Sequence, residues 1–245
     1  MKITAIIQAR MGSTRLSGKV MKDLYGKTVL AHVIERVKQS ELIEDIIIAT
    51  TDHTKDEVIA EEALRCGVKV FRGSEEDVLS RYYYAARDNN SDVIVRITSD
   101  CPLIDSRVVD QIIAYYKYNS YEIVTNASSD LTKRTYRRGL DTEVFSFGML
   151  EQAYHNAKEK YQREHVTPFI YENAQKIYYY KNETDYSKYR WTLDTEEDWD
   201  LISRIYGYLY QGEHNFYLKD IIEIMEQHQE LYEINKNIEQ KKIKG

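Results

Sequence analysis

The sequence predicts an α/β fold in which a mainly parallel sheet lies between two layers of helices. Short β-branched runs alternate with helical patterns through the first half of the chain, an order typical of parallel strands joined by right-handed crossovers. The chain has 245 residues, only two prolines and ten glycines, and no internal repeat. These features favour a single domain over two domains joined by a linker.

Five strands are expected in the first half, because apolar β-branched residues run there without helical spacing. They cover residues 3–7, 45–50, 68–71, 92–97 and 122–125. Helices are expected between them, where apolar residues recur at helical spacing, over residues 29–37, 54–66, 75–87 and 105–118. Thr28 and Ser74 are placed to cap the first and third of these helices. The carboxyl ends of the strands would then share one edge of the sheet.

The alternation breaks after the fifth strand. Residues 126–140 are polar and basic, and an irregular segment of this length in a compact domain is usually functional or mobile. Further strands are expected over residues 142–145, 176–180 and 190–193, and further helices over residues 147–159, 163–172, 196–210 and 218–227. The Lys/Glu-rich tail, residues 233–245, is expected to be a frayed helix or disordered.

Composition argues against several classes of function. Lys and Arg number 34 against 40 Asp and Glu, and a net charge of −6 gives no general attraction to nucleic acid or to an anionic membrane. No stretch approaches the ~18 consecutive apolar residues of a membrane span, and the N-terminus does not read as a signal peptide. Cys66 and Cys101 have no metal-ligand spacing and suit small buried positions in a reducing compartment. We therefore expect a cytoplasmic protein in which any anion site is local.

The first strand leads into a small, polar and basic loop, residues 8–19. Its small residues allow close approach of the backbone to a ligand, and their N–H groups can face an anion. Arg10, Arg15 and Lys19 add three cations, and such a loop at the carboxyl end of a first strand suits phosphates, above all a triphosphate. A solvated basic loop is the alternative. The loop is not a Walker A motif, because Val20 stands where Ser or Thr is required.

Two aspartates follow predicted strands at this edge. Asp100 comes after the strand over residues 92–97, and Asp194 after the strand over residues 190–193. Two carboxylates delivered toward a phosphate-binding loop suit a divalent cation with hard oxygen ligands, Mg²⁺ shared with phosphates in particular. Local sequence alone equally allows each aspartate to cap the turn that follows it.

The loop sequence QARMGSTRLSGK, residues 8–19, resembles the N-terminal signature of the 3-deoxy-manno-octulosonate and acylneuraminate cytidylyltransferase superfamily, and its SpsF-type branch in particular. The likeness continues in residues 26–30, 72–82, 137–141 and 163–168. Ser17 stands where the family usually has Pro, which frees the loop without removing a charge. The resemblance implies a three-layer, Rossmann-like sheet of the nucleotide-diphospho-sugar transferase type. It also implies a homodimer, with residues 126–190 as an inserted acceptor-binding and dimerisation region.

The resemblance further implies a site. Residues 99–104, SDCPLI, resemble a metal-binding G-D-x-P-L-I element and residues 194–198, DTEED, a D-T-x-x-D element, so Asp100 and Asp194 would hold Mg²⁺. Thr98 stands where the octulosonate enzymes have a Gln that reads cytosine. The expected catalytic residues are Arg10, Lys19 and Asp100. The expected substrate contacts are Gln8, Ala9, Gly12, Ser13, Arg15, Arg72, Thr98, Arg138 and Asp141.

The implied reaction is transfer of CMP from CTP to an acidic sugar, with release of pyrophosphate, in surface polysaccharide or glycoconjugate biosynthesis. Arg138 would clamp the sugar carboxylate at two points, and Asp141 would accept hydrogen bonds from sugar hydroxyls. One alternative is a glycosyltransferase of the same architecture, although no D-x-D motif surrounds Asp100. Another is a nucleotide-binding regulatory module without chemistry.

Three other positions favour structural roles. Asp77 and Arg81 lie four residues apart on one predicted helix, and we expect them to form an ion pair. His165, on a packed helix near Pro168, is expected to be structural rather than a general base. Arg137 receives no assigned role.

Overall fold

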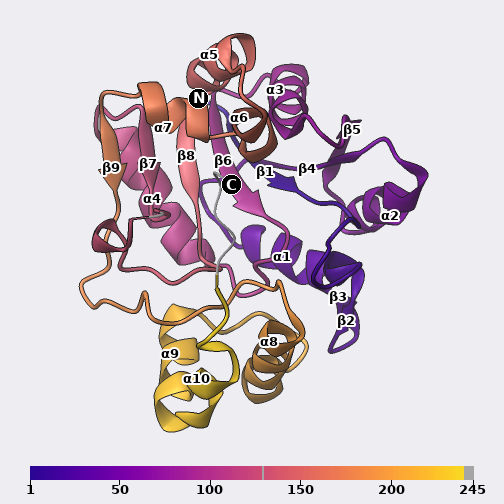
Figure 1. Ribbon diagram of the computed structural model, residues 1–245, viewed down its shortest axis with the longest axis vertical. Coiled ribbons are helices and arrows are strands. Elements are labelled where there is room, and N and C mark those ends of the chain that lie inside the picture. The colour runs from indigo at the N-terminus through magenta and orange to yellow at the C-terminus, as the bar shows by residue number, and fades with distance from the viewer. Residues whose placement is uncertain (129, 240–245) are drawn as a thin grey trace.

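The computed structural model describes residues 1–128 and 130–239, and its centre is a seven-stranded sheet of order β5-β4-β1-β6-β8-β7-β9 (Figure 1). The parallel part consists of β5 (Lys69–Gly73), β4 (Asp45–Thr51), β1 (Ile3–Gln8) and β6 (Val93–Thr98). Strand β8 (Glu143–Ser146) runs antiparallel to β6 and to β7 (Ile123–Thr125), and β9 (Ile177–Tyr179) pairs in parallel with β7. A separate hairpin pairs β2 (Asp23–Leu24) with β3 (Lys27–Thr28). The prediction of a mainly parallel α/β sheet is confirmed.

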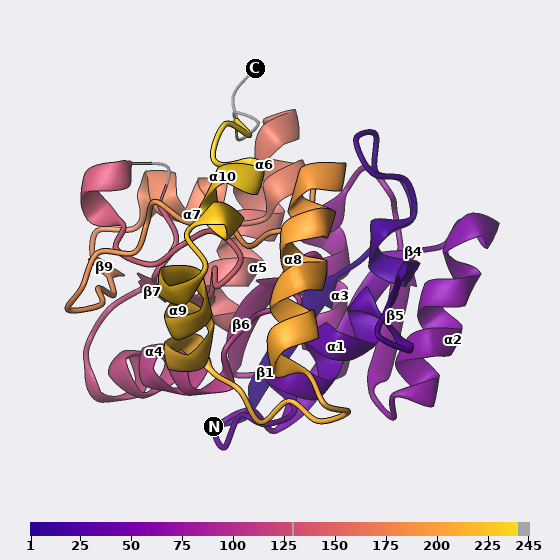
Figure 2. The same cartoon turned by 90° about the horizontal axis from the view of Figure 1, so that it is seen from below.

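Helices cover both faces of the sheet. One face carries α1 (Val29–Val37), α2 (Glu57–Arg65), α4 (Ser106–Tyr118), α8 (Glu196–Leu209), α9 (Leu218–Gln227) and α10 (Glu230–Asn235), the last three nearest the viewer in Figure 2. The other carries α3 (Val78–Asp88), α5 (Phe147–Asn156), α6 (Lys160–His165) and α7 (Pro168–Asn173). Strand side chains alternate between the two cores: Ile46 and Ile48 join the first and Ile47 the second. The three predicted layers are therefore present.

The register of the sheet brings polar segments to one edge. Gln8, at the end of β1, pairs with Ala49 of β4 on one side and with Thr98 of β6 on the other. Thr50 pairs with Arg72 in the same way. Because parallel strands end at the same edge, the loops after β1 and β6 begin side by side, where open α/β sheets bind ligands.

Several predicted elements differ in the structure. The helix predicted over residues 54–66 is divided into a 3-10 turn, η2 (Thr54–Asp56), and α2. Helix α3 begins at Val78, where Asp77 accepts the hydrogen bond from the Ser80 amide; Ser74 accepts from the Asp77 amide at 3.1 Å, but the helix does not start there. The helix predicted over residues 163–172 is divided into α6 and α7, since Val166 has a φ of 70° and Pro168 starts a new helix. Residues 190–193 form no strand of the described sheet, and only a single bridge joins Arg190 to Arg138.

The first residues of the predicted tail, 233–235, are helical. Residues 230–235 form α10, and the Asn235 side chain is buried, where it donates to the Arg190 carbonyl at 2.9 Å and to Asp198 at 2.8 Å. These two bonds satisfy a polar group that the local Lys/Glu-rich composition does not reveal. Residues 240–245 lie outside the described part of the chain.

Two buried histidines predict a loss of stability in mild acid. His32 Nδ1 lies 2.8 Å from His214 Nε2, and burial lowers both pKa values, that of His214 to about 3. Glu35 lies 3.3 Å from His214, but Lys27 already neutralises it. Below the ordinary pKa of 6.5, the histidines of the unfolded chain bind protons that the folded chain does not bind. The part of the unfolding free energy that is present above pH 6.5 is therefore lost as the pH falls toward 3.

We expect the free energy of unfolding to fall by about 2 kcal/mol for His214 between about pH 7 and pH 5. Urea denaturation at the two pH values measures it. In a His214→Gln variant the difference should shrink by that amount. An equal difference in the variant and the parent would show that His214 does not carry the effect.

Candidate active site

The loop after β1 is anchored by apolar residues and presents Lys19 inward. Leu16 and Val20 are buried, and Lys19 begins the short helix η1 (Lys19–Met21) directly after Gly18, whose φ is 62°. The expected cradle of amides is only partly available, because the N–H groups of Ser13 and Gly18 both donate to the Met11 carbonyl, at 2.8 and 3.3 Å. An anion here would depend more on side-chain cations than the sequence suggests.

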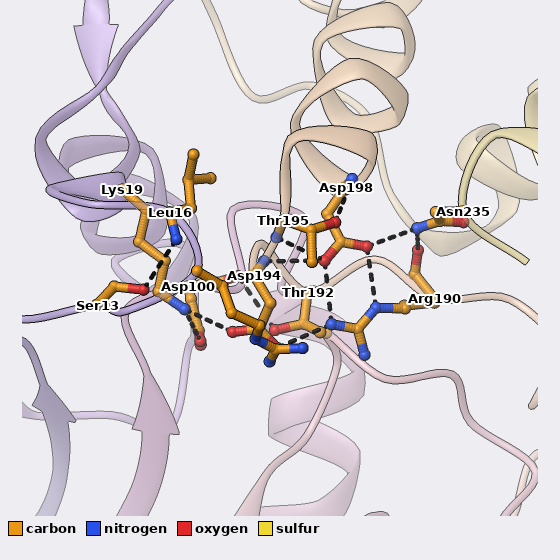
Figure 3. A network of polar contacts seen from close by, with 12 residues as sticks. Ser13, Leu16, Lys19, Asp100, Arg190, Thr192, Asp194, Thr195, Asp198 and Asn235 are labelled. Atoms are coloured by element: carbon orange, nitrogen blue, oxygen red, sulfur yellow. Dashed lines mark hydrogen bonds and ion pairs between the residues drawn. The ribbon is translucent and has the colours of Figure 1, made fainter. Parts of the chain in front are cut away.

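Lys19 lies between the two predicted metal-binding aspartates (Figure 3). Its Nζ is 2.7 Å from Asp100 Oδ2 and 2.8 Å from Asp194 Oδ1, although the three residues are far apart in sequence. Arg15 Nη2 lies 2.8 Å from the other oxygen of Asp194. Thr98 Oγ1 donates to Asp100 Oδ1 at 2.6 Å and so orients that carboxylate. The structure thus brings the basic loop and both aspartates to one point.

Backbone hydrogen bonds explain how Asp194 reaches Asp100 without a strand. The Leu193 amide donates to the Asp100 carbonyl at 2.8 Å, and the Trp191 amide donates to the Arg138 carbonyl at 2.8 Å. The segment before Asp194 is therefore held between the loop of Asp100 and the segment of Arg138. Gly139 permits this close approach, since its φ is 102° and a Cβ there would lie 2.5 Å from the Trp191 carbonyl group.

A buried network behind Asp194 fixes its position. Arg190 Nη2 lies 2.8 Å from Asp194 Oδ2, and the same guanidinium holds Asp198 through Nε at 2.9 Å. Asp198 also accepts hydrogen bonds from the backbone amides of Asp194 and Thr195 at the start of α8. Thr195 and Asp198 form a capping box, which the T-x-x-D spacing signals. Arg190 was missed in the sequence, where its i, i+4 spacing to Asp194 is the only signal.

Opposite charges dominate the electrostatics of the site. Burial alone would lower the Lys19 pKa, but Asp100 and Asp194 more than offset this and leave the pKa raised. Burial likewise works against the charged form of Asp194, yet Lys19, Arg190 and Arg15 lower its pKa to about 2. Lys19 and Asp194 are therefore both charged near neutral pH.

A Gly139→Ala substitution tests the close approach beside Trp191. The Cβ must move the Trp191 backbone as well as occupy a positive φ, so we expect a loss of about 2–4 kcal/mol in unfolding free energy. Gly212→Ala is the matched control, because its φ is 96° but a Cβ there would meet nothing within 4 Å. Urea denaturation of both variants makes the comparison. Equal losses would mean that the contact with Trp191 does not constrain residue 139.

The other predicted contacts at the ends of β1 and β5 are mostly engaged within the protein. Gln8 Oε1 accepts from Tyr82 and Arg96, at 3.2 Å each, and Ala9 is buried with its amide bonded to Ala49. Arg72 pairs with Glu57 and donates to the carbonyls of Thr51 and His53. Arg10 lies 3.6 Å from Glu75. Gly12 lies beside the same carboxylate, which a Cβ would approach to 3.1 Å.

A cavity of about 570 Å³ lies beside Arg10. Its lining also includes Asp52 and His53 after β4 and three residues after β5, Ser74, Glu75 and Glu76. This volume falls within the range of small-molecule sites. Sequence reasoning assigned no functional role to the acidic residues of this lining, Asp52, Glu75 and Glu76, although the last two lie within residues 72–82 of the resemblance.

The segment carrying Arg138 divides into buried and available cations. Arg134 is buried and pairs with Asp141, and Arg137 is buried with its guanidinium 3.6 Å from the centre of the Trp191 ring. Burial lowers the pKa of Arg137 to about 9, and its guanidinium nitrogens have no hydrogen-bond partner among the described residues. The Arg138 guanidinium likewise has no ion-pair partner among residues 1–128 and 130–239.

The structure places Asp77, Arg81 and His165, three residues outside the loop that are expected to be structural, as follows. Asp77 does not pair with Arg81: it pairs with Arg163 at 2.6 Å, 86 residues away, while Arg81 is buried. Because α3 packs against α6, this tertiary contact replaces the local one. His165 ends α6, and burial lowers its pKa.

The fold is that of the α/β nucleotidyltransferases. The sequence matches the cytidylyltransferase family over residues 4–243, and the chain belongs to that family. It is 32% identical to the spore coat polysaccharide biosynthesis protein SpsF of Bacillus subtilis over 83% of this chain and 86% of SpsF. It is 36% identical to a 3-deoxy-manno-octulosonate cytidylyltransferase of Geotalea uraniireducens over 46% of this chain and 44% of that one.

A solved structure agrees with this assignment. A cytidylyltransferase from Leptospira borgpetersenii is 38% identical, covers 99% of this chain and is itself covered completely, and superposes with a TM-score of 0.89. The predicted fold type and family resemblance are confirmed. Among the helices that the structure describes, none has the length and apolar character needed to cross a membrane.

Proposed function

We propose that this cytidylyltransferase transfers CMP from CTP to a hydroxyl of an acidic sugar. The sugar oxygen forms a bond to the α-phosphorus and its proton passes to solvent, while the bond from that phosphorus to the bridging oxygen breaks and pyrophosphate leaves with the bonding electrons. The observation that carries the proposal is the convergence of Lys19 and Arg15 with Asp100 and Asp194 at the carboxyl edge of the sheet. Names of two relatives, one acting on an octulosonate and one in spore coat polysaccharide synthesis, support the substrate class.

The loop cations are suited to a triphosphate. Phosphoryl and nucleotidyl transfers need little covalent chemistry from the protein, so positioning and charge neutralisation provide most of the catalysis. Arg10, Arg15 and Lys19 would hold the β- and γ-phosphates and neutralise the charge that develops on the leaving pyrophosphate. The cavity beside Arg10 gives the nucleoside end of the ligand a place next to the same loop.

Asp100 and Asp194 would hold Mg²⁺. Their facing oxygens already hold one cation, the Lys19 ammonium, within 2.8 Å, so the donor set fits a positive ion. No group of three or more His, Cys, Asp or Glu side chains suited to a metal occurs among residues 1–128 and 130–239. Two carboxylates alone match the habit of Mg²⁺, which takes its remaining ligands from phosphates and water. When bound, the ion would polarise the α-phosphate and acidify the attacking hydroxyl.

Arg138 would bind the carboxylate of the acceptor. Its backbone joins the segment that carries Asp194, and its guanidinium has no ion-pair partner in the described chain. A planar guanidinium binds a carboxylate at two points, which fits an acidic sugar better than a neutral one. Asp141, held by Arg134, would accept hydrogen bonds from sugar hydroxyls with its remaining capacity.

A pyrophosphate-release screen tests the reaction. CTP, ATP, GTP and UTP are crossed with a panel of octulosonates, nonulosonates and neutral sugars in the presence of Mg²⁺. We expect release only with CTP and an acidic sugar. Sugar transfer from an added nucleotide-sugar would instead favour the glycosyltransferase, and CTP binding without turnover on any sugar would favour the regulatory module.

The homodimer is likewise proposed from family resemblance. The 22 tyrosines do not by themselves support a dimer, because several stack within the chain. The ring centres of Tyr115 and Tyr178 are 4.1 Å apart, as are those of Tyr83 and Tyr154. Among the described strands, β9 pairs only with β7 and so lies at an edge of the sheet. Sedimentation equilibrium of the full chain distinguishes dimer from monomer.

A further inference from the structure

The cations expected to bind phosphates all form ion pairs with carboxylates of the protein itself. Arg10 lies on Glu75, Arg15 lies on Asp194, and Lys19 lies on both Asp100 and Asp194. The basic loop and the acidic residues therefore neutralise each other. A triphosphate cannot bind the loop, and a metal cannot bind the carboxylates, without breaking these pairs.

Lys19 occupies the point that a divalent cation would take. Asp100 has Thr98 on Oδ1, and Asp194 has Arg15 and Arg190 on Oδ2. The two remaining oxygens, Asp100 Oδ2 and Asp194 Oδ1, face each other, and Lys19 is their only hydrogen-bonding partner in the described chain. The Lys19 ammonium thus takes the position between the two carboxylates that a divalent cation would take.

We propose that Lys19 is an exchangeable placeholder between the two carboxylates of the divalent-cation site, assisted by Arg15 on the other oxygen of Asp194, so that metal and triphosphate bind with positive coupling. This inference rests on the proposed function and assigns Lys19 and Arg15 a role before the chemistry. When CTP and its metal arrive together, the cations transfer to the phosphates and the carboxylates transfer to the metal. Every charge then keeps a partner.

Either ligand alone meets a penalty. A metal without triphosphate must expel Lys19, whose side chain is only 12% exposed and would lose both carboxylates. A triphosphate without metal would draw Lys19 away and leave two carboxylates facing each other, which like charges disfavour. Each ligand removes the penalty of the other, and by linkage the coupling factor is the same in both directions.

The distinguishing variant is Lys19→Met, measured with Mn²⁺ alone on the full chain by calorimetry or by the spin resonance of free Mn²⁺. Without the ammonium the carboxylates are open, so we expect the affinity for Mn²⁺ to rise about tenfold or more. Lys22→Met is the matched control: it removes the same charge three residues away, from a lysine that pairs with Glu196 at 3.5 Å. It should change the affinity by less than about twofold, because Lys22 contacts Trp199 and the exposed Glu196 rather than Asp100 or Asp194, and its charge at the surface is screened.

Binding of a non-hydrolysable CTP analogue is the second measurement. Lys19→Met should weaken binding of the analogue and strengthen binding of Mn²⁺. Loss of a residue that merely holds the loop together would weaken both, so the opposite signs identify a placeholder. Adding Asp100→Asn to Lys19→Met should abolish the gain in Mn²⁺ affinity. Circular dichroism checks folding, and Arg15→Met offers a milder variant with a smaller gain of the same sign.

The outcomes separate the two proposals. Absence of binding of the analogue with Mn²⁺ to the unmodified protein would overturn the proposed function. Normal binding of the analogue, together with unchanged or weaker Mn²⁺ binding in Lys19→Met, or with an equal gain in Lys22→Met, would overturn the placeholder role alone.

Discussion

Asp100→Asn is expected to lower the rate of pyrophosphate release by about 10³-fold while the protein stays folded. The substitution keeps the shape of the side chain but removes one of the two charges that would hold the metal. A unit charge pair at about 4 Å near a protein surface is worth roughly 4 kcal/mol, and each 1.4 kcal/mol is about tenfold in rate. The measurement is a continuous pyrophosphate assay with CTP and the sugar identified by the screen.

Folding should survive this substitution because the Asp100 side chain is partly exposed and Lys19 keeps Asp194 as its partner. The matched control is Asp92→Asn, which removes an exposed carboxylate next to the other end of β6. It should leave the rate within about twofold of the parent. A rate near normal in purified Asp100→Asn would remove Asp100 from the proposed machinery.

The sheet was predictable because its signals are local. Strands β1, β4 and β6 are β-branched runs buried on both faces, which local sequence reveals, and α1 and α9 have the predicted boundaries. The hairpin of β2 and β3 was not predicted. The strands past residue 126 were also found, but their order was not. Pairing between β8 and β6 joins residues about fifty positions apart, and local pattern does not specify such partners.

The site was predictable only in part, for a related reason. Residue type and loop position indicated Lys19, Asp100 and Asp194, and the structure brings these side chains together. Sequence reasoning placed a strand before Asp194, whereas two backbone bonds and Gly139 hold that segment. It also missed Arg190 and Asn235, because both act by donating hydrogen bonds to Asp198, and these contacts exist only in the folded chain. The local ion pair expected between Asp77 and Arg81 is replaced by a tertiary pair between Asp77 and Arg163. Arg72, predicted to contact substrate, pairs with Glu57 in the structure.

Asp198→Asn should be the most destabilising single substitution behind the site, because both oxygens of this carboxylate face N–H donors. Its Oδ1 accepts from Arg190 Nε and Asn235, and its Oδ2 accepts from Arg190 Nη2 and from the amides of Asp194 and Thr195. An amide nitrogen at either position would face donors and leave the buried Arg190 without its main counter-charge. We expect a loss of about 3–5 kcal/mol in unfolding free energy by urea denaturation, against less than about 0.5 kcal/mol for Asp200→Asn on the same helix, which breaks only an exposed pair with Arg204. Similar losses in the two variants would mean that the network behind Asp194 is not what holds the site.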